Sequence, residues 1–175
     1  MFERILVAID GGETTRSTLE TACALADKYE SNLGILYVTD PEEVTDDLIR
    51  EAQIEGILDS PDYSGAIDHF AYHQTSTLRD NMRRAEAVSR LSVEIAQSVV
   101  AEAEAFTKGK NAKAVKTFVR SGDVAKAILG VASEAAADLI VMGHTRRSVL
   151  GDLVHSSAAQ AVDKKAKCPC LILSQ

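Results

Sequence analysis

The chain has 175 residues, of which 46% are hydrophobic and only 5% aromatic, and a formal net charge of −7 at neutral pH. That length is enough for one domain with its own core, without support from metals or disulfides. The acidic balance opposes the phosphate backbone of nucleic acid, and no dense run of Lys and Arg offsets it, so we exclude nucleic-acid binding. No apolar stretch reaches the roughly 18 to 20 residues of a membrane span, and the N-terminus begins as a strand rather than as a signal peptide, so we expect a cytoplasmic protein with no membrane partner.

Short apolar runs separated by segments of helical period predict a parallel sheet with helices between its strands. In chain order the runs are Ile5–Ile9, Leu33–Val38, Val115–Val119, Leu139–Met142 and Cys170–Leu173. The run Val115–Val119 is interrupted by Lys116, which indicates an edge strand. Strands that alternate with helices favour right-handed crossovers and an open, doubly wound α/β sheet.

Four helices are predicted from apolar stripes or capping signals. The third follows Gly122, with Asp123 as its N-cap. The stripes are Leu19–Cys23–Ala26, Val88 to Phe106, Ala125 to Ala132 and Leu150 to Ala161.

We predict a single domain over residues 1–175, with an insertion at about 40–84 after the second strand. This segment holds two of the three prolines and several acidic residues, and Ile49 to Ile57 indicates a short helix. His69 and His73 within it are spaced like two metal ligands on a helix, but two ligands do not make a site, so we interpret them as surface residues. The three cysteines do not fit a disulfide framework, and we expect free thiols.

Ligands of open α/β sheets bind beyond the carboxyl ends of the strands, where the strand order reverses. That rule selects Asp10–Glu13, Val38–Asp40, Arg120–Gly122 and Met142–Arg147. The segment after the fourth strand leads into a predicted helix, whose first turn offers unpaired N–H groups to an anion.

The sequences ILVAID (residues 5–10), GD with its following helix (122–123) and DLIVMGH (138–144) with the later SSA (156–158) resemble the universal stress protein family. The resemblance implies five parallel strands in the order 3-2-1-4-5 with helices on both faces, an adenine nucleotide alpha hydrolase-like fold. It also implies a cytoplasmic stress-response or regulatory module, commonly a homodimer, without an established catalytic activity.

Nucleotide-binding members of this family carry Gly, two residues, Gly, nine residues, Gly and then Ser or Thr. In this chain Gly143 and Ser157 keep the first and last positions, whereas Arg146 and Ser156 replace the other two glycines. A Cβ at these positions crowds a phosphate or disfavours positive φ, which indicates weak or absent ATP binding. As an alternative, the Arg146 guanidinium and the serine hydroxyls bind phosphate in a different geometry.

The resemblance places Asp10 near the adenosine part of the ligand and the Val38 backbone near adenine, with Met142 ending the strand before Gly143. Asp10 has an alternative role, which is to order the turn or cap the first helix. The segment DGGETT (residues 10–15) superficially resembles the pyrophosphate loop SGGxDS of adenylating enzymes, but Asp10 stands where that loop has serine and would repel pyrophosphate.

Three functions follow as hypotheses. The first is a non-enzymatic stress-response module that acts as a homodimer and through a regulatory protein partner, with weak or no ATP binding. The second is a sensor that binds ATP or AMP as its cofactor, and the third is a slow ATPase. For the homodimer we expect pairing at the apolar edge Cys170–Leu173, because exposed sheet edges tend to pair.

Overall fold

The structure, a computed structural model, describes residues 1–12, 14–39, 44–58, 72–110, 112–143 and 158–173, and only the backbone of residues 72–80. The chain divides into two compact units. The sheet unit comprises Met1–Thr39 and Ala96–Gln175, and the helical unit comprises Asp40–Ile95. The assignment of one domain with an insertion at 40–84 stays a prediction.

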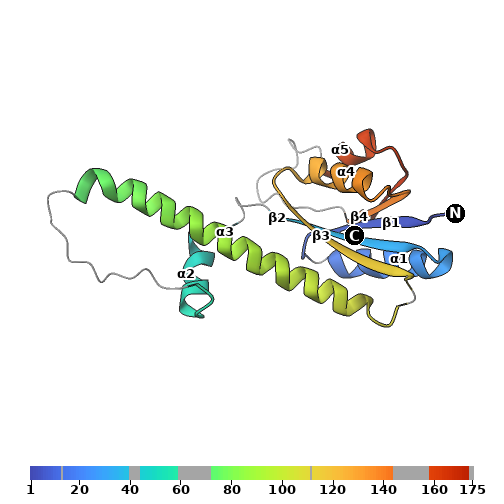
Figure 1. The fold of residues 1–175 in the computed structure, drawn as a ribbon, viewed down its shortest axis with the longest axis horizontal. Helices are drawn as coiled ribbons and strands as arrows, with labels where there is room; N and C mark the ends of the chain where they lie inside the picture. The colour runs from blue at the N-terminus through green and yellow to red at the C-terminus, as the bar shows by residue number, and fades with distance from the viewer. Residues whose placement is uncertain (13, 40–43, 59–71, 111, 144–157, 174–175) are drawn as a thin grey trace. The chain divides into compact units, whose positions relative to one another are not determined.

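The sheet unit is built on five parallel strands in the order β3-β2-β1-β4-β5 (Figure 1). This confirms the predicted α/β fold, its strand order and the edge position of the third strand. The strands are β1 (Arg4–Ile9), β2 (Asn32–Thr39), β3 (Ala114–Ser121), β4 (Leu139–Gly143) and β5 (Cys170–Leu173). Because the chain runs outward from β1 through β2 to β3 and then returns to β4, the strand order reverses between β1 and β4.

Helices cover both faces of the sheet, with α4 (Val124–Glu134) and α5 (Ala158–Lys165) on one and α1 (Thr14–Tyr29) on the other (Figure 1). Alternate strand residues divide between the two faces because side chains alternate along a strand. Toward α4 and α5 lie Leu6, Leu36, Phe118, Ile140 and Met142. The predicted stripe Leu19–Cys23–Ala26 of α1 is buried, as expected.

The predicted starts of two helices can be compared with the structure. Asp123 caps α4 as predicted, and its carboxylate accepts a hydrogen bond from the Lys126 N–H at 2.8 Å. The fourth predicted helix, from Leu150 to Ala161, is described only from Ala158, where α5 begins. None of the described helices combines the length and the apolar character needed to cross a membrane.

The helical unit has its own small core. Helix α2 (Asp46–Ile54), the short helix predicted here, begins at Thr45, whose Oγ1 accepts a hydrogen bond from the Leu48 N–H. The buried core side chains are Val44, Ala52, Leu58, Val88 and Leu91. Helix α3 (Tyr72–Thr107) contributes to this unit up to Ile95 and to the sheet unit from Ala96. His69 lies outside the described residues, and within the described ones no cluster of His, Cys, Asp and Glu suits a metal ion.

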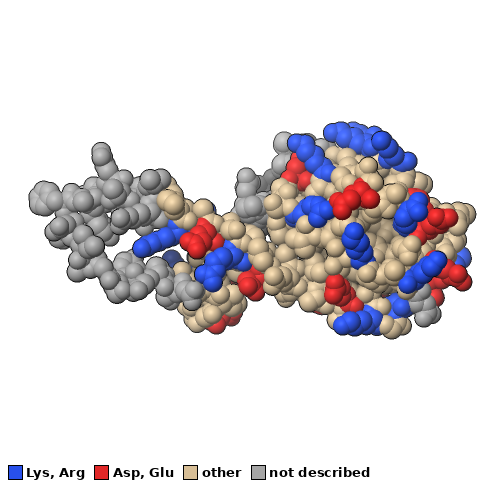
Figure 2. Space-filling view, in the orientation of Figure 1, with Lys and Arg blue, Asp and Glu red and all other residues tan. Residues whose placement is uncertain are grey.

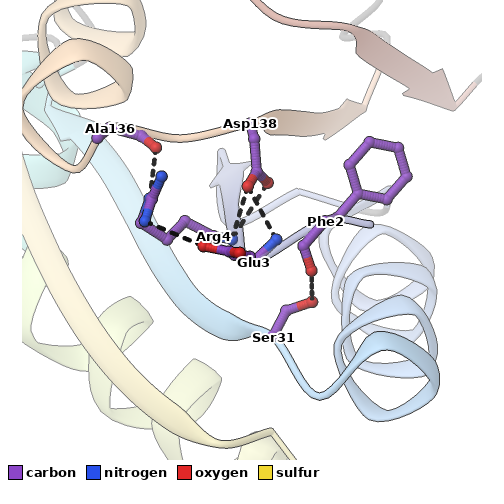
Figure 3. Close-up of polar contacts among 6 residues, drawn as sticks. All are labelled: Phe2, Glu3, Arg4, Ser31, Ala136 and Asp138. Atoms are coloured by element: carbon purple, nitrogen blue, oxygen red, sulfur yellow. Dashed lines mark hydrogen bonds and ion pairs between the residues drawn. The ribbon is translucent and has the colours of Figure 1, made fainter.

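The amino-terminal end of the sheet is held by the carboxylate of Asp138 (Figure 3). It accepts hydrogen bonds from the backbone N–H groups of Glu3 at 2.8 Å and Arg4 at 3.1 Å. The Arg4 Nε–H donates to the Ala136 carbonyl at 2.7 Å. These bonds hold β1 against β4 at the amino-terminal end of the sheet. Together with the register of the two strands, they place the end of β1 beside the end of β4 at Gly143.

Candidate functional site

The turn after β1 is organised by Asp10 at the carboxyl end of the sheet. Its Oδ1 accepts hydrogen bonds from the Gly12 N–H at 2.9 Å and from the Thr15 hydroxyl at 3.0 Å. Gly11 adopts φ +74°, a conformation that favours glycine. Asp10 therefore orders the turn and holds the first turn of α1, which is the alternative role considered for it. Thr15 was not among the predicted site residues, and its only sequence signal is a hydroxyl placed where a helix starts.

Gly143, at the end of β4, lies against the beginning of α1. A Cβ built on Gly143 would come 2.6 Å from Thr14 Oγ1, 3.0 Å from Thr14 Cβ and 3.2 Å from Thr18 Oγ1. Real Cβ atoms essentially never approach another atom as closely as 2.6 Å, and the other two contacts are tight, so packing alone favours glycine here. The close approach of α1 to the sheet is thus a reason for glycine at position 143 that does not depend on its backbone φ angle.

The backbone carbonyl of Val38 is directed toward the turn of residues 10–12. Backbone groups of a parallel strand alternate between its two neighbours. The Asn32 N–H donates to Glu3 on the β1 side, whereas the Thr39 carbonyl accepts from Gly122 on the β3 side. Val38 is an even number of positions after Asn32, so its backbone N–H and carbonyl also face β1. Since β1 ends at Ile9, opposite Tyr37, the Val38 carbonyl is directed to the space beside the turn of residues 10–12.

The other predicted site residues divide into one that is described and three that are not. Met142 is buried, and its side chain belongs to the core on the α4 and α5 face rather than to the carboxyl end of the sheet. Arg146, Ser156 and Ser157 lie outside the described residues. The structure therefore brings together Asp10, the Val38 backbone and Gly143, around the point where the strand order reverses.

Two further side chains close the turn on the α1 side of the sheet. A Cβ on Gly11 would lie 3.2 Å from a methyl group of Val99 in α3 and 4.0 Å from the ring of Tyr37. Tyr37 is buried in β2. A short apolar wall that includes one aromatic ring thus flanks the turn. The sequence reasoning missed it because Tyr37 reads only as a strand residue.

The thiols with shifted acidity belong to the core and the far edge rather than to this site. Burial raises the pKa of the Cys23 thiol, and nearby Lys110 opposes the shift. Burial also raises the pKa of Cys168 and of Cys170, with Asp138 and Asp163 adding to the respective shifts. All three cysteines are free thiols, as expected.

The sequence pattern of the Universal stress protein family matches residues 1–57 and 65–174. The chain belongs to the universal stress protein family. Universal stress protein YxiE of Bacillus subtilis is 30% identical to it over 99% of both chains.

Solved structures of universal stress proteins share the fold. The chain is similar to universal stress protein UspA from Lactobacillus plantarum, with a TM-score of 0.66 and 20% identity over 98% of this chain and 97% of that one. It is also similar to a universal stress protein in complex with cAMP, with a TM-score of 0.60 and 17% identity over the same shares. Between residues 1 and 174 the family match skips residues 58–64, and so it includes most of the segment 40–84.

Proposed function

We propose that this universal stress protein is a cytoplasmic, non-catalytic regulatory module of a stress response, which acts as a homodimer and through contacts with a protein partner. In this proposal it binds ATP weakly or not at all. Its family membership supports the stress-related role. The weak ATP binding is a feature of this chain's own residues and rests on its departures from the glycine frame.

The packing of Gly143 supports the proposal, because it gives a reason for this glycine that needs no nucleotide. Of the three frame glycines, Gly143 alone is present, and α1 requires it there whether or not a phosphate binds. Asp10 likewise has two hydrogen-bond donors within its own turn. Gly143 and Asp10, which match nucleotide-binding members, are therefore explained by folding, and the two remaining glycine positions of the frame, 146 and 156, do not match.

A sensor of adenine nucleotides is the second candidate, and the direction of the Val38 carbonyl favours it. A carbonyl aimed at the space beyond β1 is an acceptor for the amino group of adenine. A similar structure is described as a complex with cAMP, which has a single phosphate. A ligand of that kind needs less of the phosphate loop than ATP does, so AMP or cAMP suits this site better than ATP.

Nucleotide binding is tested on the full chain by two measurements. Freshly purified protein is denatured and any released nucleotide is identified by mass spectrometry, and then ATP, AMP and cAMP are titrated into apo protein by calorimetry. The proposal expects no released ATP and little heat at millimolar ATP. Tight ATP binding that is lost in Arg146→Ala, but kept in the control Arg16→Ala on the exposed side of α1, overturns it in favour of a sensor. Release of inorganic phosphate from ATP would instead support the third hypothesis, a slow ATPase.

The homodimer is tested at β5. Strand β5 is four residues long, lies at the edge of the sheet and carries no charge. Ile172→Lys places a charge on it and is expected to give a monomer in analytical ultracentrifugation. The matched control is Val115→Lys at the opposite edge, which is expected to leave the dimer intact. A folded Ile172→Lys protein that remains dimeric contradicts pairing through β5.

A further inference from the structure

The two edges of the sheet differ in length and charge. Strand β5 has four residues, all apolar or Cys, whereas β3 has eight residues, every one of which is in register with β2. Long, open edges are templates for another strand, and proteins usually protect them with charges. Edge β3 carries Lys116 and Arg120 and follows Lys113.

The side of β3 away from β2 presents the backbone N–H and carbonyl of every second residue. One of these groups is already engaged, because the Val119 carbonyl accepts a hydrogen bond from the Arg120 guanidinium at 3.0 Å. The Gly122 N–H donates to Thr39 of β2, and the Thr39 hydroxyl donates to the Arg120 carbonyl. Even-numbered residues of β3 therefore face β2. By the alternation of a parallel strand, the backbone groups of Val115, Thr117 and Val119 face away from the sheet.

The side chains of these outward-facing residues lie on the α1 side of the sheet and are open. Val115 is 40% exposed and Val119 is 43% exposed. Between them, the Thr117 hydroxyl donates to Glu104 of α3 at 3.0 Å. A strand added here would find two exposed aliphatic side chains on this face, which pair well with aliphatic residues across a ladder.

The opposite face of β3 offers positive charge. Lys116 Nζ lies 4.7 Å and the Arg120 guanidinium 5.7 Å from the ring centroid of Phe118, which is buried between them. Arg120 also pairs with Glu134 at 2.6 Å. Within the described part of the chain, no carboxylate forms an ion pair with Lys113 or Lys116. These two ammonium groups are therefore available to a partner's carboxylates.

The overall negative charge of the chain does not cancel this patch. Residues 40–95 carry 13 Asp and Glu against 5 Lys and Arg, so the sheet unit, with 13 against 14, is close to neutral. On the face of the sheet unit drawn in Figure 2, cations and carboxylates are interspersed. β3 itself carries Lys116 and Arg120 and follows Lys113, and the Glu104 carboxylate of α3 is bonded to the Thr117 hydroxyl.

We propose that the free edge of β3 is the docking site for an extended segment of a partner protein in which aliphatic and acidic residues alternate. The segment adds a sixth strand to the sheet, with its aliphatic residues beside Val115 and Val119 and its acidic residues beside Lys116. This inference rests on the proposed function, because it supplies the surface through which the module contacts a protein. A second copy is a poor occupant, since pairing β3 with β3 would oppose like charges.

The test uses a blocked synthetic peptide of four Val-Glu repeats as the probe, added in millimolar amounts to the full-length protein. Amide hydrogen exchange is followed by NMR. The amides of Val115, Thr117 and Val119 are expected to exchange at least about tenfold more slowly with the peptide, because each gains an acceptor. The amides of Lys116 and Phe118 should change little, since they already face β2. A peptide of four Val-Lys repeats should have no effect.

Two variants separate strand addition from charge attraction alone. Lys113→Glu with Lys116→Glu is expected to weaken the binding of the acidic peptide about tenfold, which is the scale of two surface ion pairs replaced by repulsion. Lys164→Glu with Lys165→Glu on α5 changes the net charge equally and should bind normally. Val119→Pro removes an N–H group that faces away from β2, so it breaks no hydrogen bond between β3 and β2. This variant should also bind the acidic peptide more weakly, whereas Val119→Thr should bind it normally.

Unchanged exchange at all three outward amides overturns the proposal and means that the lysines only keep this edge unpaired. If the Val-Glu and Val-Lys peptides slow the exchange of these amides equally, the inference that the partner segment is acidic is wrong. Neither result touches the proposed function, which fails instead if ATP binds tightly. A variant with Lys113→Glu and Lys116→Glu that loses peptide binding yet keeps the wild-type dimer supports docking at β3 separately from dimerisation.

Discussion

Replacing Gly143 by alanine is expected to destabilise the fold even when no ligand is present. The added methyl group would stand 2.6 Å from Thr14 Oγ1 and 3.0 Å from Thr14 Cβ. Thr14 is β-branched and opens α1, so it cannot swing far, and Thr18 bonds back to its carbonyl at 2.7 Å. Relief requires α1 to shift from the sheet. Overpacking of this kind costs about 1–3 kcal/mol.

The assay is urea or thermal unfolding of apo Gly143→Ala. A loss of about 2 kcal/mol corresponds to a decrease in Tm of about 4–8 °C for a chain of this size. The matched control is Gly130→Ala in α4, where an added Cβ meets nothing within 4 Å. That change is expected to stabilise by about 0.5–1 kcal/mol, because glycine is a poor helix residue.

A second change identifies the clashing atom. Adding Thr14→Ala to Gly143→Ala removes Oγ1, the nearest atom, and should recover part of the lost stability, so that the two changes are not additive. If Gly143→Ala is as stable as the wild type, the packing argument is wrong. Gly143 would then be free to serve a ligand, and it would count as a match to the nucleotide-binding members rather than as a packing residue.

Two further predictions concern Asp138, at the amino-terminal end of the sheet, and the buried thiol of Cys23. Asp138→Ala is expected to cost about 1–2 kcal/mol in urea unfolding, because it leaves the Glu3 and Arg4 N–H groups without their carboxylate; the exposed Asp27→Ala is the control, and equal stability of the two variants would refute the role of Asp138. For the thiols, burial raises the folded-state pKa of Cys23 above its ordinary value of 9.0. The unfolded chain therefore releases this proton first, and stability should fall as pH rises past about 9. Cys23→Ala should make that decline shallower, and an unchanged slope would show that Cys23 does not contribute.

The sequence predicted the features that local patterns determine. The buried strands are apolar at nearly every position, and the capping residue Asp123 stands directly before the apolar stripe of α4. Lys116 indicated an edge strand, and β3 is at the edge. The strand order came from the family resemblance, since no local pattern encodes which strands become neighbours.

What the sequence did not reveal depends on contacts between distant residues or on helices without an apolar stripe. Helix α3 begins at Tyr72, well before the stripe that starts at Val88, and the mostly polar residues between them carry no apolar stripe from which a helix could be predicted. The crowding of Gly143 by Thr14 joins the end of β4 to the start of α1. A glycine required by such packing looks the same in a sequence as one required by a phosphate.

Because Gly143 has this second explanation, the other two glycine positions of the family's frame, 146 and 156, decide whether weak ATP binding is expected. Since α1 already requires Gly143, the case for weak binding rests on Arg146 and Ser156, which lie outside the described residues. Restoring both glycines, as Arg146→Gly with Ser156→Gly, should raise ATP affinity at least tenfold, about 1.4 kcal/mol, if side chains there exclude the triphosphate. The control pairs Arg16→Gly with Ser17→Gly on α1, which alters glycine content elsewhere. Calorimetry that finds lower affinity after the glycines are restored would mean that the Arg146 guanidinium binds phosphate, and the chain would then be a nucleotide sensor with a phosphate loop of its own design.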